Sequence, residues 1–197
     1  MSMTLTSELL LENYKRSNEW VERLFGNTDS RVEIVKIIFE NITAPYTAYP
    51  SPYSQFLIEI HLPDRKEDWE IRKNLTHELV HCLMPNGQPS HQATFFEEGL
   101  AEHSSIYYMD DNYSMIRENG EVEHDFWRRS STGKYKIAFD LIEKIVEFEG
   151  LEEMREAVRN MRLDTGLPFS QITAGHMSIY FPDTPMQFLK ELEKRFH

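Results

Sequence analysis

The stretch Thr76-His77-Glu78-Leu79-Val80-His81 lies within residues 67–83, where the sequence predicts a helix. Residues four apart on a helix lie about one turn apart on nearly the same face. The imidazoles of His77 and His81 can therefore share one metal ion. Glu78 follows the first histidine directly, and a carboxylate at that position can hold a metal-bound water and accept its proton.

A second informative segment is Phe95-Phe96-Glu97-Glu98-Gly99-Leu100-Ala101-Glu102-His103. A catalytic zinc ion usually has three protein ligands and one open position, so the two histidines need a third partner. Sixteen residues separate His81 from Glu98, which is enough for a turn and an antiparallel second helix. Because Glu98 and Glu102 are one turn apart, one can face the metal while the other orients a histidine ligand.

Together these segments resemble the gluzincin metallopeptidases, a group that includes thermolysin and the aminopeptidase N branch. In that group His-Glu-x-x-His is followed, on the next helix, by Asn-Glu-Gly-(Phe/Leu)-Ala, whose Glu is the third zinc ligand. The resemblance covers residues 67–108 and implies that Glu98 binds one Zn²⁺ ion together with the two histidines. It also implies that Glu97 takes the place of the Asn and that Glu102 orients a histidine. The Gly-x-Met-Glu-Asn signature of the aminopeptidase branch is absent upstream, so aminopeptidase activity is not implied.

Other histidines compete for the third ligand position. The metzincin spacing would require Gly at position 84 and His at position 87, but the chain has Met84 and Gly87. His91 follows a loop rich in turn-forming residues, which favours a solvated or capping role. His103 would point about 100° away from the face shared by Glu98 and Glu102. Glu98 is therefore the preferred ligand.

A hydrogen-bond donor is also expected, to stabilise the oxyanion that forms during amide hydrolysis. The run Gly133-Lys134-Tyr135-Lys136-Ile137-Ala138-Phe139 resembles a degenerate form of the Tyr-x-Lys-Gly-(Ala/Phe) segment of the aminopeptidase branch. The resemblance implies that Tyr135 is this donor, although an amphipathic residue at a helix start would fit the same pattern. His124 and His176 are the alternatives for the role.

These features predict a zinc-dependent metallopeptidase, a hydrolase that cleaves peptide or related amide bonds. Glu78 would act as the general base, and the partner would be a peptide or protein substrate. The alternative is a catalytically inactive, peptidase-like protein with a binding or regulatory role. Such a protein would be expected to lose a ligand or Glu78, and this sequence retains them all.

Composition indicates one globular domain spanning residues 1–197, because 40% of the residues are hydrophobic and 12% aromatic. The net charge of −12 argues against a nucleic-acid partner, which needs basic surfaces. No apolar run approaches the ~20 residues of a membrane span, and the first residues lack the pattern of a signal peptide. With Cys82 as the single cysteine, a cytoplasmic location is expected.

The expected fold is α+β and predominantly α, with a small sheet beside the metal-binding helix, a mainly helical C-terminal half, and a cleft between them. Helical periodicity covers residues 5–24, and Gln55–Leu62 alternates like a strand. Arg31–Ile42 fits a helix or a strand. The later elements are expected as a ligand helix at 92–109, a polar connection at 113–132, helices up to Gly150 and at 151–161, an extended loop at 167–182 and a final helix at 186–196.

Overall fold

The computed structural model describes residues 7–50, 56–64, 67–84, 93–113 and 126–196. Over these residues the protein is a predominantly helical α+β structure with a small mixed sheet, as the sequence predicted. The elements are α1 (Ser7–Phe25), β1 (Glu33–Glu40), β2 (Tyr46–Ala48), β3 (Leu57–Pro63), α2 (Asp68–Cys82), α3 (Phe95–Asn112), α4 (Phe126–Ser130), α5 (Gly133–Glu149), α6 (Leu151–Thr165), the short 3₁₀ helix η1 (Phe169–Gln171), α7 (Ala174–Tyr180) and α8 (Met186–Leu192). No helix in the described part of the chain has the length and apolar character needed to cross a membrane.

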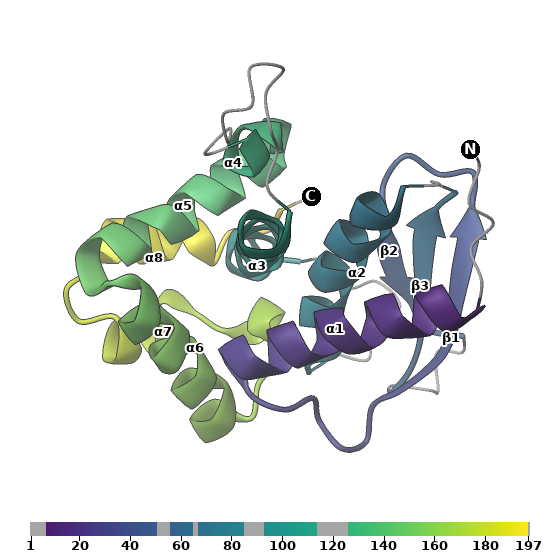
Figure 1. The fold of residues 1–197 in the computed structure, drawn as a ribbon. Helices are drawn as coiled ribbons and strands as arrows, with labels where there is room; N and C mark the ends of the chain where they lie inside the picture. The colour runs from purple at the N-terminus through teal and green to yellow at the C-terminus, as the bar shows by residue number, and fades with distance from the viewer. Residues whose placement is uncertain (1–6, 51–55, 65–66, 85–92, 114–125, 197) are drawn as a thin grey trace.

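The sheet lies at one side of the molecule and α5 to α8 at the other, with α2 and α3 between them (Figure 1). Its strand order is β1-β3-β2, with β1 parallel and β2 antiparallel to the central β3. Ile58, Ile60 and Leu62 alternate along β3 and are buried, as expected for a strand with one face covered by helices. The segment that fitted either a helix or a strand forms β1, in keeping with its many β-branched residues.

A partly buried polar network fixes α2 against α1. The Asn13 side chain donates to Asp68 Oδ1 at 2.7 Å and accepts from Arg72 Nε at 2.7 Å. Arg72 also forms an ion pair with Asp68 at 3.1 Å, and the Tyr113 hydroxyl donates to the same carboxylate at 2.9 Å. The N-terminal half of α2 is thereby held by residues of α1 and of the segment that follows α3.

Helix α3 packs between α2 and α5, and its contact with α5 depends on Gly99. A Cβ on Gly99 would lie 2.7 Å from the carbonyl oxygen of Ala138 and 2.7 Å from Cγ1 of Ile142. Glycine therefore allows the two helices to approach more closely than any other residue would. This approach brings the beginning of α5 close to the α2–α3 pair.

The expectation of an extended loop over residues 167–182 is wrong, because this segment forms η1 and α7. Phe169, Ile172, Met177 and Phe181 of this segment are buried, and Phe169 packs edge-on to both Phe25 and Phe96. Helix α7 begins with a capping box, in which Thr173 accepts from the backbone of His176 and the His176 side chain accepts from the backbone of Thr173.

The ends of two other helices also differ from expectation. Helix α6 continues to Thr165 and ends at Gly166, whose φ of 61° is the left-handed conformation that glycine favours. Helix α8 ends at Leu192 rather than at Phe196. The chain that follows forms a β-bridge between Arg195 and Thr94, immediately before α3.

Candidate metal centre

The second half of α2 carries His77, Glu78 and His81, all of which are nearly or fully buried. The two imidazole rings lie on neighbouring turns, with centroids 5.3 Å apart. One possible ligand atom from each of the three residues lies within 4.8 Å of the others. The local helix alone accounts for this grouping, because residues i and i+4 lie on nearly the same face.

Helix α3 brings Glu98 to the same point. Oε2 of Glu98 lies 3.3 Å from Nε2 of His77, and Oε1 lies 3.9 Å from Nε2 of His81. The N-cap of α3 is Thr94, whose hydroxyl accepts from the backbone N–H of Glu97 at 3.3 Å. This N-cap fixes the first turn of α3, and the three acidic residues of the site follow within the next two turns.

The other nitrogen of each ring contacts a different carboxylate. Nδ1 of His77 lies 3.4 Å from Glu102 Oε2, and Nδ1 of His81 lies 2.9 Å from Glu97 Oε1. A carboxylate beside Nδ1 favours the tautomer with its proton on that nitrogen, which leaves Nε2 free to bind a metal. Both rings therefore direct Nε2 towards Glu98.

At His77 the spacing of donor atoms matches a tetrahedral zinc site. Zinc bonds of about 2.0–2.1 Å place two tetrahedral donors about 3.3–3.4 Å apart. Oε2 of Glu98 lies at this separation from Nε2 of His77, whereas the contact with Nε2 of His81 is made by the other oxygen, Oε1, and is longer, at 3.9 Å. Glu78 is a second carboxylate near the histidines. Of the two carboxylates, Glu98 is the one with an oxygen within 4 Å of Nε2 of both histidines. Glu98 therefore stays the predicted third ligand.

The carboxylates of the site create a strong preference for positive charge. Burial lowers the pKa of His77, but hydrogen bonds to Glu102 and Glu98 raise it to about 10. Burial likewise lowers the pKa of His81, whereas the charge of Glu98 and the hydrogen bond to Glu97 raise it to about 9. Without a metal, the rings hold protons that balance these carboxylates, and a divalent ion can take the place of those protons.

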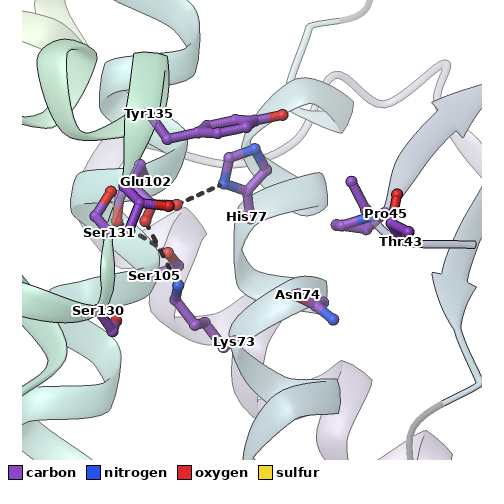
Figure 2. A pocket seen from close by; sticks show the side chains of 12 residues that line it. Thr43, Pro45, Lys73, Asn74, His77, Glu102, Ser105, Ser130, Ser131 and Tyr135 are labelled. Atoms are coloured by element: carbon purple, nitrogen blue, oxygen red, sulfur yellow. Dashed lines mark hydrogen bonds and ion pairs between the residues drawn. The ribbon is translucent and has the colours of Figure 1, made fainter.

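Glu78 and Tyr135 have properties suited to proton transfer and hydrogen-bond donation. Burial raises the pKa of the Glu78 carboxyl, against the opposing charges of His81 and His77. Burial also raises the pKa of Tyr135, with a further contribution from the nearby carboxylates, so its hydroxyl remains protonated. The Tyr135 ring makes an edge-type contact with the His77 ring, with centroids 5.8 Å apart and ring planes at 70° (Figure 2). The structure thus brings the predicted base and the predicted donor to one site.

A cavity of about 180 Å³ opens beside His77 and Glu102 (Figure 2). Tyr135 lines one side of it, and Thr43 and Pro45 line the opposite side, just before β2. Most of the remaining lining residues are polar: Lys73, Asn74, Ser105, Ser130, Ser131 and Thr132. A substrate bound here would lie between the edge of the sheet and the beginning of α5.

The remaining histidine candidates lie elsewhere or outside the described residues. His103 is fully buried and faces α5, where its Nε2 lies 3.1 Å from Glu143 Oε1. His176 takes part in the capping box of α7, which is well separated from α2 (Figure 1). His91 and His124 lie outside the described residues.

Two contacts were not anticipated from the sequence. Glu97 was identified only as the substitute for an Asn, and its contact with His81 was not foreseen. Lys73 lies one turn before His77 on α2 and donates to Glu102 Oε1 at 3.4 Å. Lys73 and His77 are four residues apart and therefore share a helix face. This spacing could have indicated that Lys73 lies close to the carboxylate that contacts His77.

Comparisons of the chain with family models, with curated proteins and with solved structures find no match. The resemblance to the gluzincins rests on the residues of the two motifs.

Proposed function

We propose that this protein is a zinc-dependent metallopeptidase that hydrolyses peptide or related amide bonds. The observation that carries the proposal is the convergence of Nε2 of His77, Nε2 of His81 and the Glu98 carboxylate, with Glu78 buried beside them. This donor set leaves a fourth position open, which is the usual arrangement of catalytic rather than structural zinc sites. When bound, zinc supplies a Lewis acid that polarises a carbonyl and lowers the pKa of water.

Glu78 accepts a proton from the attacking water and delivers it to the departing amine. Glu78 acts first as a base and then as an acid. A group with both roles works best when its pKa is nearer to neutrality, and the raised pKa of Glu78 is a shift in that direction. Tyr135 donates its hydroxyl hydrogen to the carbonyl oxygen on which negative charge develops. Glu102 holds the His77 ring in place through Nδ1.

The sheet provides a means of binding a peptide. Strand β2 is at the edge of the sheet, and among the described strands it pairs only with β3. An extended peptide can add to such an edge through backbone hydrogen bonds. The residues just before β2 line the cavity beside His77, so a peptide on this edge would pass close to the site. A cytoplasmic location is part of the proposal, because Cys82 is a buried free thiol.

The test is a peptide-library digestion with zinc-loaded protein and its Glu78→Gln variant. We expect cleavage by the wild type only, with zinc content equal in both, because the ligands are unchanged. Glu70→Gln, on the first turn of the same helix, is the matched control and should cleave normally. A wild-type protein that binds zinc but cleaves no peptide would instead support the inactive binding protein. Cleavage by Glu78→Gln at the wild-type rate would contradict the proposed mechanism.

A further inference from the structure

The first turn of α3 places a charged side chain against the second histidine of the site. Glu97 is 4% exposed, and its Oε1 lies 2.9 Å from Nδ1 of His81 in the last turn of α2. This is the shortest of the recorded contacts between the carboxylates of α3 and the two histidines. A carboxylate is buried at such a position only when its charge is compensated.

The contact gives the two histidines equivalent surroundings. His77 has the Glu102 carboxylate at Nδ1 and Glu98 at Nε2, while His81 has Glu97 at Nδ1 and Glu98 at Nε2. A hydrogen bond to an ionised acceptor is roughly twice as strong as a bond between neutral groups. A carboxylate therefore holds its histidine more firmly, and makes it a stronger ligand, than a neutral amide would.

We propose that Glu97 is a positioning residue for His81, and that its negative charge increases the affinity of the site for a divalent metal. The proposal rests on the proposed metal site and concerns the position at which the Glu97-Glu98-Gly99-Leu100-Ala101 segment departs from the Asn-Glu-Gly-(Phe/Leu)-Ala motif of the gluzincins. Glu97 keeps the proton of His81 on Nδ1 and directs Nε2 towards Glu98. Each histidine of the site then has its own carboxylate at Nδ1, Glu102 for His77 and Glu97 for His81.

Two variants separate the charge of Glu97 from its hydrogen bond. Glu97→Gln retains an oxygen that can accept from Nδ1 of His81 but lacks the charge, while Glu97→Leu lacks both. Glu143→Gln is the matched control, because Glu143 also contacts a buried histidine, His103, which is not part of the site. Zinc affinity is measured by competition with a chromophoric chelator, and the metal geometry by the visible absorption spectrum of the Co²⁺-loaded protein.

We expect zinc affinity to fall by roughly 10–100-fold in Glu97→Leu, by a smaller factor in Glu97→Gln, and not at all in Glu143→Gln. The cobalt spectrum of Glu97→Leu should also change, which a loss of stability alone would not cause. Unchanged affinity in Glu97→Gln and Glu97→Leu would overturn the proposal. If Glu97→Leu does not fold, unchanged affinity in Glu97→Gln overturns it. A wild-type protein that binds neither zinc nor cobalt contradicts both this proposal and the proposed function.

Discussion

Gly99 on α3 and Ala138 on α5 approach so closely that a Cβ on Gly99 would lie 2.7 Å from the Ala138 carbonyl oxygen. Glu98 precedes Gly99, and Tyr135 lies one turn before Ala138 on α5. The contact therefore sets the distance between the predicted third ligand and the predicted oxyanion donor. The Glu-Gly-Leu-Ala segment has glycine at position 99 because a side chain there would clash with α5.

We expect Gly99→Ala to destabilise the protein by roughly 1–3 kcal/mol, because the added methyl group must push α3 and α5 apart. The proposed peptidase activity should fall with it, since Tyr135 moves relative to Glu98. Urea unfolding and kcat measure the two effects. Gly175→Ala, in the first turn of α7, is the control: its Cβ would lie 3.6 Å from Oγ1 of Thr173, an ordinary van der Waals distance, and stability should be unchanged or higher by up to about 1 kcal/mol. Equal stability of the Gly99 variant and the wild type would contradict the packing argument.

Replacing Tyr135 by Phe should lower kcat by roughly 10²–10³-fold, the effect of removing one oxyanion donor. Zinc affinity should not change, because the ring is retained and no predicted ligand is altered. Tyr107→Phe is a matched control, since the Tyr107 hydroxyl contacts Glu143 and Arg128 rather than the site. An unchanged kcat in the Tyr135 variant would transfer the role to His124 or to another tyrosine.

Replacing Glu102 by Ala should weaken zinc binding by roughly 10–100-fold and leave the number of bound ions unchanged. The Glu102 carboxylate is ionised in the folded protein: burial raises its pKa, but the hydrogen bond to His77 and the charge of Lys73 lower it to about 2. Glu152→Ala, at an exposed position on α6, should have no effect. A metal-bound structure in which Glu102 contacts the ion and Glu98 does not would show that the assignment of the ligand is wrong.

Zinc should stabilise the protein more at high pH than at low pH. The pKa values of His77 and His81, about 10 and about 9 in the metal-free protein, lie above the ordinary value of 6.5. A group whose pKa is raised on folding adds stability that is complete below 6.5 and is lost as the pH rises through the raised value. The metal-free protein should therefore become less stable between pH 6.5 and 10.

In the zinc-loaded protein the ion replaces these protons, so no such loss is expected. Urea unfolding of both forms at pH 6.5 and pH 9 measures the difference, with the metal-free form prepared by chelation. The gain in unfolding free energy on adding zinc should be larger at pH 9. The same gain at both pH values would show that protons and metal do not compete for the two rings.

Local sequence patterns predicted the elements nearest to the site. The helix expected over 67–83 is α2, and the strand expected over 55–62 is β3, displaced by one or two residues at each end. The segment 167–182 could not be recognised, because its helices are short and depend on distant partners. Phe169, for example, is buried by Phe25 of α1 and Phe96 of α3, which a local pattern cannot show.

The sequence by itself determined that His77 and His81 share a face with Glu78 beside them, because the period of a helix is a local property. Only the tertiary structure decided which carboxylate meets which nitrogen. A rotation of α3 by one residue would turn its side chains by about 100° and exchange the partners of the histidines. The packing of α3 between α2 and α5, with the close contact at Gly99, fixes that rotation and places Glu97 against His81.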